Sequence, residues 1–524
     1  MRQCIQGVAL AILVATPAAA QLPAIGAPRG FVRFEIGGDW ANTTNQLFNG
    51  ADQPYRAEFS TPLIGSAFYP ELSQTQARIA QLSGIGGYTL SVGGATMVAQ
   101  ASVGTLRLGA TIGLTSKLSI FGMVPVVRQQ VQVNYGYDST GANAGYNPAD
   151  PVFGSAAGAD SVNAFLLEYK TALDTLSARI AGGYYVDPDS LALAEATLAS
   201  GAAYYAGLDS LFVVSGAAGS FVPLASSSAG QAMAGEISNV QTAMAALSIS
   251  SFTQPLPLPA GALSPSEYNT YLTTPAGSIG ATPFATETSF LLGDMEFGAS
   301  YTIIDRWNRP EQPGGLRVVA QGLVRLPTGY QPLPNDFVSL PTGGGQTDIQ
   351  ASVVADVGGG RFGARLAGSY NDQLSTTADR RVTLPSQPIP WSNRLATVSQ
   401  DPGDEFTLSA LPYFQLVPGF AVVGVLRYWS HGADAVEYAS AADAIPGVSA
   451  SELATDTERS ATIVGGGLSW APSQVGTRTG TKYPVDAFWL YEAVVSGSGG
   501  VVPKAGTMRM GFRWPFRFWG STSE

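Results

Sequence analysis

The sequence predicts an all-β protein: a transmembrane antiparallel β-barrel of about 12 strands (range 12–14) that carries a helical extracellular insertion. Three observations predict this fold class. Apolar and polar residues alternate with a period of two in many segments, which is typical of β-strands. Charged residues make up 12% of the chain, against about 25% in an ordinary soluble domain. The chain also lacks an apolar run long enough for a transmembrane helix.

The first 20 residues are typical of a secretory signal peptide. Arg2 precedes an apolar run over 8–15, and three alanines at 18–20 precede Gln21. The run is too short to span a bilayer, so we expect cleavage rather than anchoring. Cys4 is the only cysteine, so we expect no disulfide, no Cys-ligated metal and no cysteine-linked lipid in the mature chain. Such an exported chain suits the cell outer membrane of a Gram-negative bacterium.

The overall charge excludes one class of partner. Lys and Arg total 27, whereas Asp and Glu total 38, which gives a formal net charge of −11. An acidic exported chain is a poor candidate for nucleic-acid binding, which depends on basic patches. We therefore expect no nucleic-acid partner, and the sequence suggests no cofactor and no metal site.

The predicted strands follow from the alternation. In 106–114, Leu106, Leu108 and Ile112 alternate with Arg107 and Thr111. The apolar row of the next strand changes phase near residue 128, which we interpret as a β-bulge at 128–130. The twelve predicted strands occupy 31–40, 106–114, 118–137, 295–303, 316–326, 349–357, 362–370, 406–416, 420–428, 464–470, 485–495 and 508–518.

The last strand shows which face should meet lipid. In 508–518 every even position is large and apolar, whereas Arg509, Arg513 and Arg517 occupy odd positions. An arginine at the bilayer midplane of a barrel's outer face costs about 2–4 kcal/mol, so the arginines should face an enclosed interior. A soluble β-sandwich also alternates, but it would carry many charges on its surface. Scarce charges and aromatic residues at strand ends favour the barrel.

The lengths of the connections also indicate a barrel. Outer-membrane barrels have short periplasmic turns and longer extracellular loops. With both termini periplasmic, an even strand number places every long connection outside. A hairpin within 50–103 would raise the count to 14. Short links at 115–117, 358–360 and 417–419 alternate with long ones at 42–103, 138–286, 327–346, 372–404 and 432–458.

The chain divides into a signal peptide (1–20), first barrel strands with a long loop (21–137), an Ala/Ser-rich helical insertion (138–286) and the remaining strands (287–524). The insertion has three stretches with helical spacing, after Asp160-Ser161, over 191–203 and over 231–247. One more short helix fits 66–84, and the prolines of 255–275 predict an extended return. An extracellular cap and a plug inside the lumen both remain open for this insertion.

Thirteen residues are candidates to line the lumen. The arginines of this set outnumber the acids that we expect to point inward. These acids are Glu35, Glu296, Asp348 and Glu405, of which Glu296 and Asp348 belong to the set. An excess of one charge sign sets ion preference, so we expect a weak anion preference in a conducting pore. Structural ion pairs across the lumen explain the same residues equally well. The candidates are Arg107, Glu296, Arg317, Gln321, Arg325, Asp348, Gln350, Arg361, Arg365, Arg427, Arg509, Arg513 and Arg517.

Motifs for catalysis or metal binding are weak. His431 is the only histidine, and a hydrolase would need it as a base beside a serine nucleophile and an orienting group. We recognise no nucleophile elbow, so the sequence predicts no enzyme. The acidic stretches 147–150 and 187–190 could suggest Ca²⁺, but turn and helix-cap chemistry explains both.

One passage resembles a known family. Phe290 to Tyr301 (FLLGDMEFGASY), followed by 324–329 (VRLPTG), resembles the GxGD(L/M)xxGxxY … LPTG passage of the meta-pathway phenol-degradation-like outer-membrane protein family. The resemblance implies a porin-like barrel that moves aromatic or other hydrophobic compounds, without assigning a ligand. The insertion 138–286 departs from the family pattern.

Together these observations predict an outer-membrane channel for passive uptake of small hydrophobic or aromatic molecules. The expected partners are outer-membrane lipid, a small-molecule solute and the outer-membrane assembly machinery. Two alternatives remain: a structural or adhesive surface protein without transport, and an outer-membrane hydrolase that uses His431.

Overall fold

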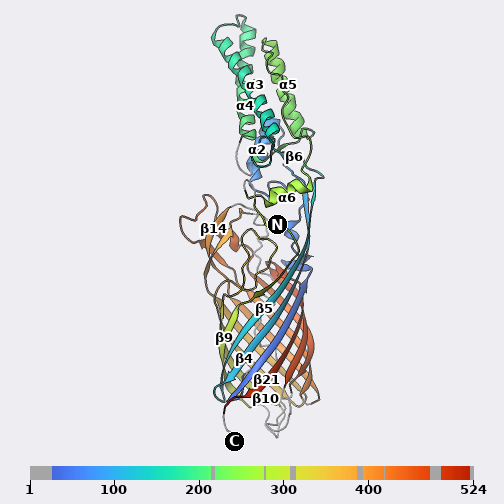
Figure 1. The fold of residues 1–524 in the computed structure, drawn as a ribbon, viewed down its shortest axis with the longest axis vertical. Helices are drawn as coiled ribbons and strands as arrows, with labels where there is room; N and C mark the ends of the chain where they lie inside the picture. The colour runs from blue at the N-terminus through green and yellow to red at the C-terminus, as the bar shows by residue number, and fades with distance from the viewer. Residues whose placement is uncertain are drawn as a thin grey trace.

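The computed structural model describes residues 26–213, 219–275, 279–306, 314–385, 387, 394–417, 419–471 and 485–519. The predicted signal peptide lies outside the described residues. Figure 1 shows a closed barrel with helices stacked beyond one of its ends.

Twelve antiparallel strands close the barrel, as the sequence predicts. Strand β1 pairs with both β4 and β21, and β4 pairs with β5, so the sheet has no free edge at this seam. Strand β8 (Glu287–Leu292) is a thirteenth strand, which pairs with β5 just ahead of β9. The barrel strands are β1 (Phe31–Thr43), β4 (Gly94–Gly113), β5 (Leu118–Asp138), β9 (Met295–Asp305), β10 (Gly314–Leu326), β11 (Asp348–Gly359), β12 (Phe362–Gln373), β15 (Glu405–Val417), β16 (Phe420–His431), β18 (Arg459–Trp470), β19 (Asp486–Gly499) and β21 (Gly506–Arg517).

The outer wall of the barrel is apolar and the inner wall is polar. On β21, the side chains of Phe512 and Phe516 are 44% and 56% exposed, whereas those of Arg509 and Arg513 are 4% and 3% exposed. Large apolar side chains are exposed in the same way on each of the remaining barrel strands. A continuous exposed apolar wall of this extent requires a lipid environment. The fold is therefore a transmembrane β-barrel.

The two ends of the barrel differ in the length of their connections. We call the end with short links, such as 114–117 and 360–361, the turn end, and the opposite end the loop end. The long connections 44–93, 139–286, 327–347, 374–404 and 432–458 all lie at the loop end (Figure 1). A further barrel hairpin within 50–103 is not formed. That stretch holds β3 (Ala51–Pro54), the 3-10 helix η2 (Ala57–Phe59), α2 (Leu72–Ser83) and the first residues of β4.

The predicted β-bulge at 128–130 is wrong. Strands β4 and β5 pair without a register shift from Gly94↔Asp138 to Gly113↔Ser119. Along β5 the apolar residues change from even to odd residue numbers because the surroundings of the strand change. Toward the turn end of β5, even-numbered residues such as Ile120 are exposed to lipid, whereas toward the loop end the odd-numbered Val127 and Val131 are buried in the apolar cluster of the loop-end segments. A real register shift lies nearby, between β5 and the β8–β9 pair, where Gly293 and Asp294 interrupt the strand.

Small sheets and helices cover the loop end. Three-stranded sheets are formed by β2 (Asn45–Phe48), β3 and β20 (Val502–Pro503), and by β13 (Thr376–Arg381), β14 (Leu395–Asp401) and β17 (Ala435–Tyr438); β6 (Ala144–Tyr146) pairs with β7 (Phe221–Pro223). The insertion carries α3 (Ala156–Ala181), α4 (Pro188–Phe212), α5 (Ser228–Ala246) and α6 (Pro265–Thr273), and the 3-10 helix η4 spans Ala450–Ala454. Among the described helices, none is long and apolar enough to cross a membrane.

The helix caps explain where the predicted boundaries fail. Helix α3 starts before Asp160, since Ser155 is its N-cap and accepts a hydrogen bond from the Gly158 N–H at 3.0 Å. Asp187 caps α4 through the Ser190 N–H at 2.9 Å, with Pro188 in the first turn. The predicted extended return is interrupted by α6, because proline is well accommodated in the first turn of a helix. The helix predicted within 66–84 is α2.

The helices of the insertion pack on one another through an aromatic core. Tyr169 and Phe165 are buried, and the rings of Tyr169 and Phe252 stack with centroids 4.5 Å apart. The Tyr169 hydroxyl donates to the Gly201 carbonyl at 2.9 Å, so its polar end is satisfied. Asp150 accepts backbone hydrogen bonds within a turn, as its turn chemistry predicts. Figure 1 shows α3, α4 and α5 projecting beyond the loop end.

Candidate functional site

Charged side chains cross the barrel interior as a ladder of alternating sign. Arg107 on β4 pairs with Asp39 on β1. Arg509 on β21 lies between Asp39 and Glu492, at 3.9 and 3.7 Å. Arg427 on β16 donates to both Glu492 oxygens at 2.9 and 3.3 Å. These five residues come together because each occupies the inward parity of its strand. Strands β4, β1, β21 and β19 are consecutive in the sheet, whereas β18 lies between β19 and β16, so the Arg427–Glu492 pair spans β18.

Two further groups of ion pairs lie nearer the turn end. Glu35 accepts from Arg33 at 2.7 Å and from Arg513 at 3.0 Å. Arg365, whose side chain is fully buried, holds both oxygens of Asp356 at 2.6 and 2.9 Å. This two-point geometry is the strongest form of the arginine–carboxylate pair. The register places Asp356 directly opposite Arg365 on the neighbouring strand.

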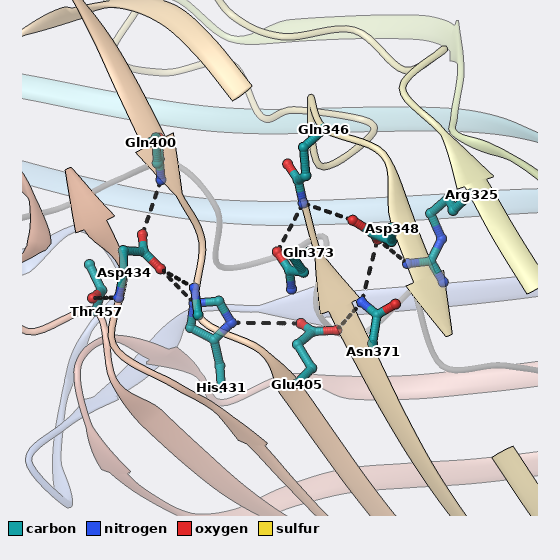
Figure 2. A network of polar contacts seen from close by, with 11 residues as sticks. Arg325, Gln346, Asp348, Asn371, Gln373, Gln400, Glu405, His431, Asp434 and Thr457 are labelled. Carbon is teal, nitrogen blue, oxygen red and sulfur yellow. Dashed lines mark hydrogen bonds and ion pairs between the residues drawn. The ribbon is translucent and has the colours of Figure 1, made fainter. Parts of the chain in front are cut away.

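A polar row runs around the inner wall at the loop end (Figure 2). Arg325 donates to Asp348 at 2.6 Å and to Glu296 at 3.1 Å. Asn371 bridges Asp348 and Glu405 at 3.4 and 3.3 Å, so the row passes from β10 to β15. The strand register places Arg325 opposite Asp348, Asn371 opposite Glu405, and Glu405 opposite His431. The contact between Asp348 and Asn371 is diagonal, because the register places Gln373 opposite Asp348.

His431 ends this row. Its Nε2 lies 3.0 Å from an Asp434 oxygen and its Nδ1 lies 4.0 Å from a Glu405 oxygen (Figure 2). The His431 ring also stacks with that of Trp429, with centroids 6.2 Å apart. Burial raises the pKa of the Asp434 carboxyl, but hydrogen bonds from His431 and the Gly403 N–H outweigh this effect and hold the pKa below its usual value. Among the described contacts of His431 there is no serine hydroxyl, so the arrangement resembles a structural clamp more than a nucleophile–base pair.

The predicted lumen residues fall into three sets. Eight are in the ion pairs and rows above: Arg107, Glu296, Arg325, Asp348, Arg365, Arg427, Arg509 and Arg513. Arg317 pairs with Asp305 near the turn end, Gln321 accepts from the Ser352 hydroxyl at 3.4 Å, and Gln350 is buried. The expectation for the other two needs correction. Arg361 lies in the turn between β11 and β12 with an exposed side chain, and Arg517, the last residue of β21, is also exposed, with its guanidinium 5.2 Å from the Phe31 ring.

Sequence reasoning missed the acids that partner these arginines. The predicted set of inward acids omits Asp39, Asp356 and Glu492, although alternation places Asp39 opposite the apolar row of 31–40 and each of the three shares the parity of an inward-facing neighbour on its own strand. With these acids included, the interior carries carboxylates beside its arginines. The expected excess of positive charge therefore shrinks, and the ion-pair alternative accounts better for these side chains.

The segments that cover the loop end of the barrel pack on one another through aromatic rings. Tyr135 on β5 lies 4.7 Å from Phe284 between ring centroids, and Phe284 lies 6.2 Å from Phe59. The Tyr268 hydroxyl on α6 is within 3.1 Å of that of Tyr69 and 3.2 Å of that of Tyr135. Burial raises the pKa of Tyr268 well above its ordinary value. We call this set of five rings the aromatic neck.

Comparison with known proteins gives no family. No family model matches the chain, and no curated protein matches it. The resemblance to the meta-pathway phenol-degradation-like family therefore stays a prediction from its motifs.

Several solved structures are similar in outline. An outer membrane channel from Pseudomonas putida F1 aligns with a TM-score of 0.41 at 9% identity, covering 96% of this chain and all of that one. The Ralstonia pickettii toluene transporter TbuX aligns at 0.30 and 9% identity, covering 98% and 95%. The P. putida toluene transporter TodX aligns at 0.27 and 11% identity, covering 99% and 96%. These likenesses are too weak to carry an argument about function.

Proposed function

We propose that this chain is an outer-membrane channel for the passive uptake of small hydrophobic molecules, with the loop end outside the cell. One observation carries the proposal: a closed barrel with an apolar outer wall encloses a polar interior, and an apolar aromatic neck stands at its loop end. Within the neck, the half-buried rings of Tyr135 and Phe284 offer an apolar surface to a hydrophobic solute that leaves water. Short turns and long loops support the orientation.

The ion pairs of the interior affect which solutes such a channel would admit. Paired charges present little net field to a permeating ion, whereas a single sign would attract counter-ions. A twelve-stranded barrel is also narrow compared with sixteen-stranded porins. We therefore expect low conductance, with weak ion selectivity, and preference for compact uncharged solutes.

Blocking the interior from within tests the proposal. With Cys4 replaced by serine the chain has no cysteine, so a single thiol can be placed on either face of β10. Gln321→Cys puts it inside the barrel, and Val324→Cys puts it on the lipid face, where the valine is 39% exposed. The measurement is the initial uptake of a radiolabelled monoaromatic compound by Gram-negative host cells that express the chain, before and after a bulky thiol reagent.

We expect the reagent to reduce uptake in the Gln321→Cys chain and to leave the Val324→Cys chain unchanged. Uptake no greater than that of cells without the chain would contradict the proposal. Equal uptake by fully labelled Gln321→Cys chains would contradict it as well, since mass spectrometry of the purified protein confirms labelling independently.

A surface-contact role is the second candidate, favoured by exposed apolar residues on the insertion. Leu167, Tyr184 and Val186 have side chains that are 67%, 58% and 93% exposed. Isolated exposed apolar residues are common, so we rank this role second. A chain that gives no uptake but makes cells adhere or aggregate would favour it over the channel.

A further inference from the structure

The loop 327–347 is attached at both ends to one carboxylate. The Asp294 side chain accepts the Gly329 N–H at 2.8 Å through one oxygen and the Gly344 N–H at 2.7 Å through the other. Asp294 lies in the interruption between β8 and β9 and is buried. Hydrogen bonds to a charged acceptor are about twice as strong as neutral ones, so this carboxylate is the main polar contact of the loop's base.

Two threonines repeat the same arrangement beside it. The chain contains the tetrapeptide LPTG twice, at 326–329 and 340–343. The Thr328 hydroxyl donates to the Gly293 carbonyl at 2.8 Å, and the Thr342 hydroxyl donates to the Leu292 carbonyl at 2.6 Å. The Tyr330 N–H in turn donates to the Thr342 hydroxyl at 2.8 Å, which ties the two repeats together. Both repeats thus dock on the short segment that joins β8 to β9.

Glycine is needed where the repeats meet. A Cβ atom at Gly329 would lie 2.7 Å from the backbone of Gly343 and 2.9 Å from an Asp294 oxygen. Any side chain there would force the two repeats or the carboxylate apart. The passage that resembles the GD … LPTG motif is therefore a physical unit, an aspartate enclosed by two turns.

The body of the loop closes onto the aromatic neck. Phe337, Val338 and Leu340 are buried in the same apolar cluster as the inward residues of β5. The centroid of the Phe337 ring lies 6.3 Å from that of Phe59. The Arg381 guanidinium carbon lies over the Phe337 ring, 5.6 Å from its centroid. The body of the loop is thus held by apolar contacts, and also by hydrogen bonds from the Ser339 hydroxyl to Glu287 at 2.6 Å and from the Arg381 guanidinium to the Pro334 carbonyl at 2.7 Å. Asp294 differs from these contacts because its one carboxylate holds both ends of the base.

We propose that the loop 327–347 is a gate at the loop-end mouth and that Asp294 is the latch that holds it closed. This inference rests on the proposed function, because it assigns the control of solute passage to this loop. A hydrophobic solute can replace the apolar contacts of Phe337 and Leu340, but it offers nothing in place of the carboxylate. The latch therefore sets how often the gate opens, and the apolar surface of the aromatic neck selects which solutes enter.

The test uses a thiol that reports opening directly. In the full chain with Cys4→Ser, Leu340→Cys places a thiol at a site that is 2% exposed. Asp294→Asn keeps the shape of the side chain but can accept only through one oxygen. Loss of one charged acceptor should lower the closed-to-open ratio on the order of tenfold. The rate at which a thiol reagent labels the Leu340→Cys chain should rise with it.

Two further variants keep the test decisive. Thr342→Val removes the second attachment with little change of volume and should also speed labelling, even if Asp294→Asn fails to fold. Asp336→Asn is the matched control, because the hydrogen bonds that Asp336 accepts from described residues come from the N–H groups of Val338 and Ser339 within the loop. It should leave the rate within about twofold of the parent chain.

Uptake of the monoaromatic compound by the same cells separates this inference from the function. Faster labelling with faster uptake supports both. Faster labelling without any uptake in parent or variant keeps the latch and removes the channel. Labelling rates that do not differ between parent, Asp294→Asn and Thr342→Val chains overturn the latch, whatever the uptake shows.

Discussion

The two halves of the β4–β5 hairpin use the same alternating pattern in opposite ways. Toward the turn end, Leu106 and Leu108 are apolar and exposed, and Arg107 between them points inward to Asp39. Toward the loop end, Met97 and Ala99 are apolar and buried, and Val98 between them is 70% exposed. The register between the two strands never changes. The side on which the apolar residues lie changes because the medium around the strand changes from lipid to water.

This contrast shows what an alternating pattern can and cannot specify. A period of two establishes that a segment is a strand and that its faces differ. It does not say whether the apolar face meets lipid outside or a packed core inside. In the barrel the interior is polar and paired, whereas in the insertion the interior is apolar. A change of phase within one strand therefore marks the level at which the wall leaves the membrane.

The largest effect is expected from breaking an ion pair of the polar interior. Arg365→Met removes a fully buried cation and leaves Asp356 buried without its partner. Such a loss costs about 3–5 kcal/mol. We expect the free energy of unfolding, measured by urea titration in lipid vesicles, to fall by this amount.

The double variant Arg365→Met/Asp356→Leu is the control for this change. Replacing a whole buried pair by apolar groups is often close to neutral, so most of the lost stability should return. A double variant as unstable as the single one would mean that the interior needs the charges themselves, and it would remove the pairing argument.

The next effect concerns the outer face on the two sides of the phase change. Leu108→Arg places a charge on the lipid face and should cost about 2–4 kcal/mol near mid-depth. Val98→Arg places the same charge on the same face of the same strand, ten residues away, or roughly 33 Å along it. We expect a change within about 0.5 kcal/mol there, because the site should be in water.

Both substitutions can be measured in the same vesicle titration. Equal costs at the two positions would show that the hydrocarbon reaches Val98, and the boundary drawn from the phase change would be misplaced.

Local sequence patterns predict much of this fold. The features that they do not predict depend on contacts between segments that are distant in the sequence. The twelve strands and the lipid face follow from alternation, as at Phe512 and Arg513. The β-bulge was wrong because the burial of Val131 depends on packing at the loop end, which no local pattern contains. Among the site residues, Arg365 could be placed inside, but its partner Asp356 required the strand register. The enclosure of Asp294 by two LPTG turns could not be foreseen, since only the fold brings 329 and 344 together.

The smallest effect is expected at a helix cap in the water-exposed half. Ser264 and Glu267 form a capping box at the start of α6, with each side chain bound to the other's backbone N–H. Ser264→Ala should cost about 1 kcal/mol. Because α6 carries Tyr268 of the aromatic neck, hydrogen exchange should quicken in α6 and around Tyr135, while β10 to β12 keep their protection. Uniformly faster exchange across the barrel strands would show that the barrel and the loop-end segments unfold as one unit. The phase change in the β4–β5 hairpin would then mark a change of solvent around the strands and not a boundary between regions of different stability.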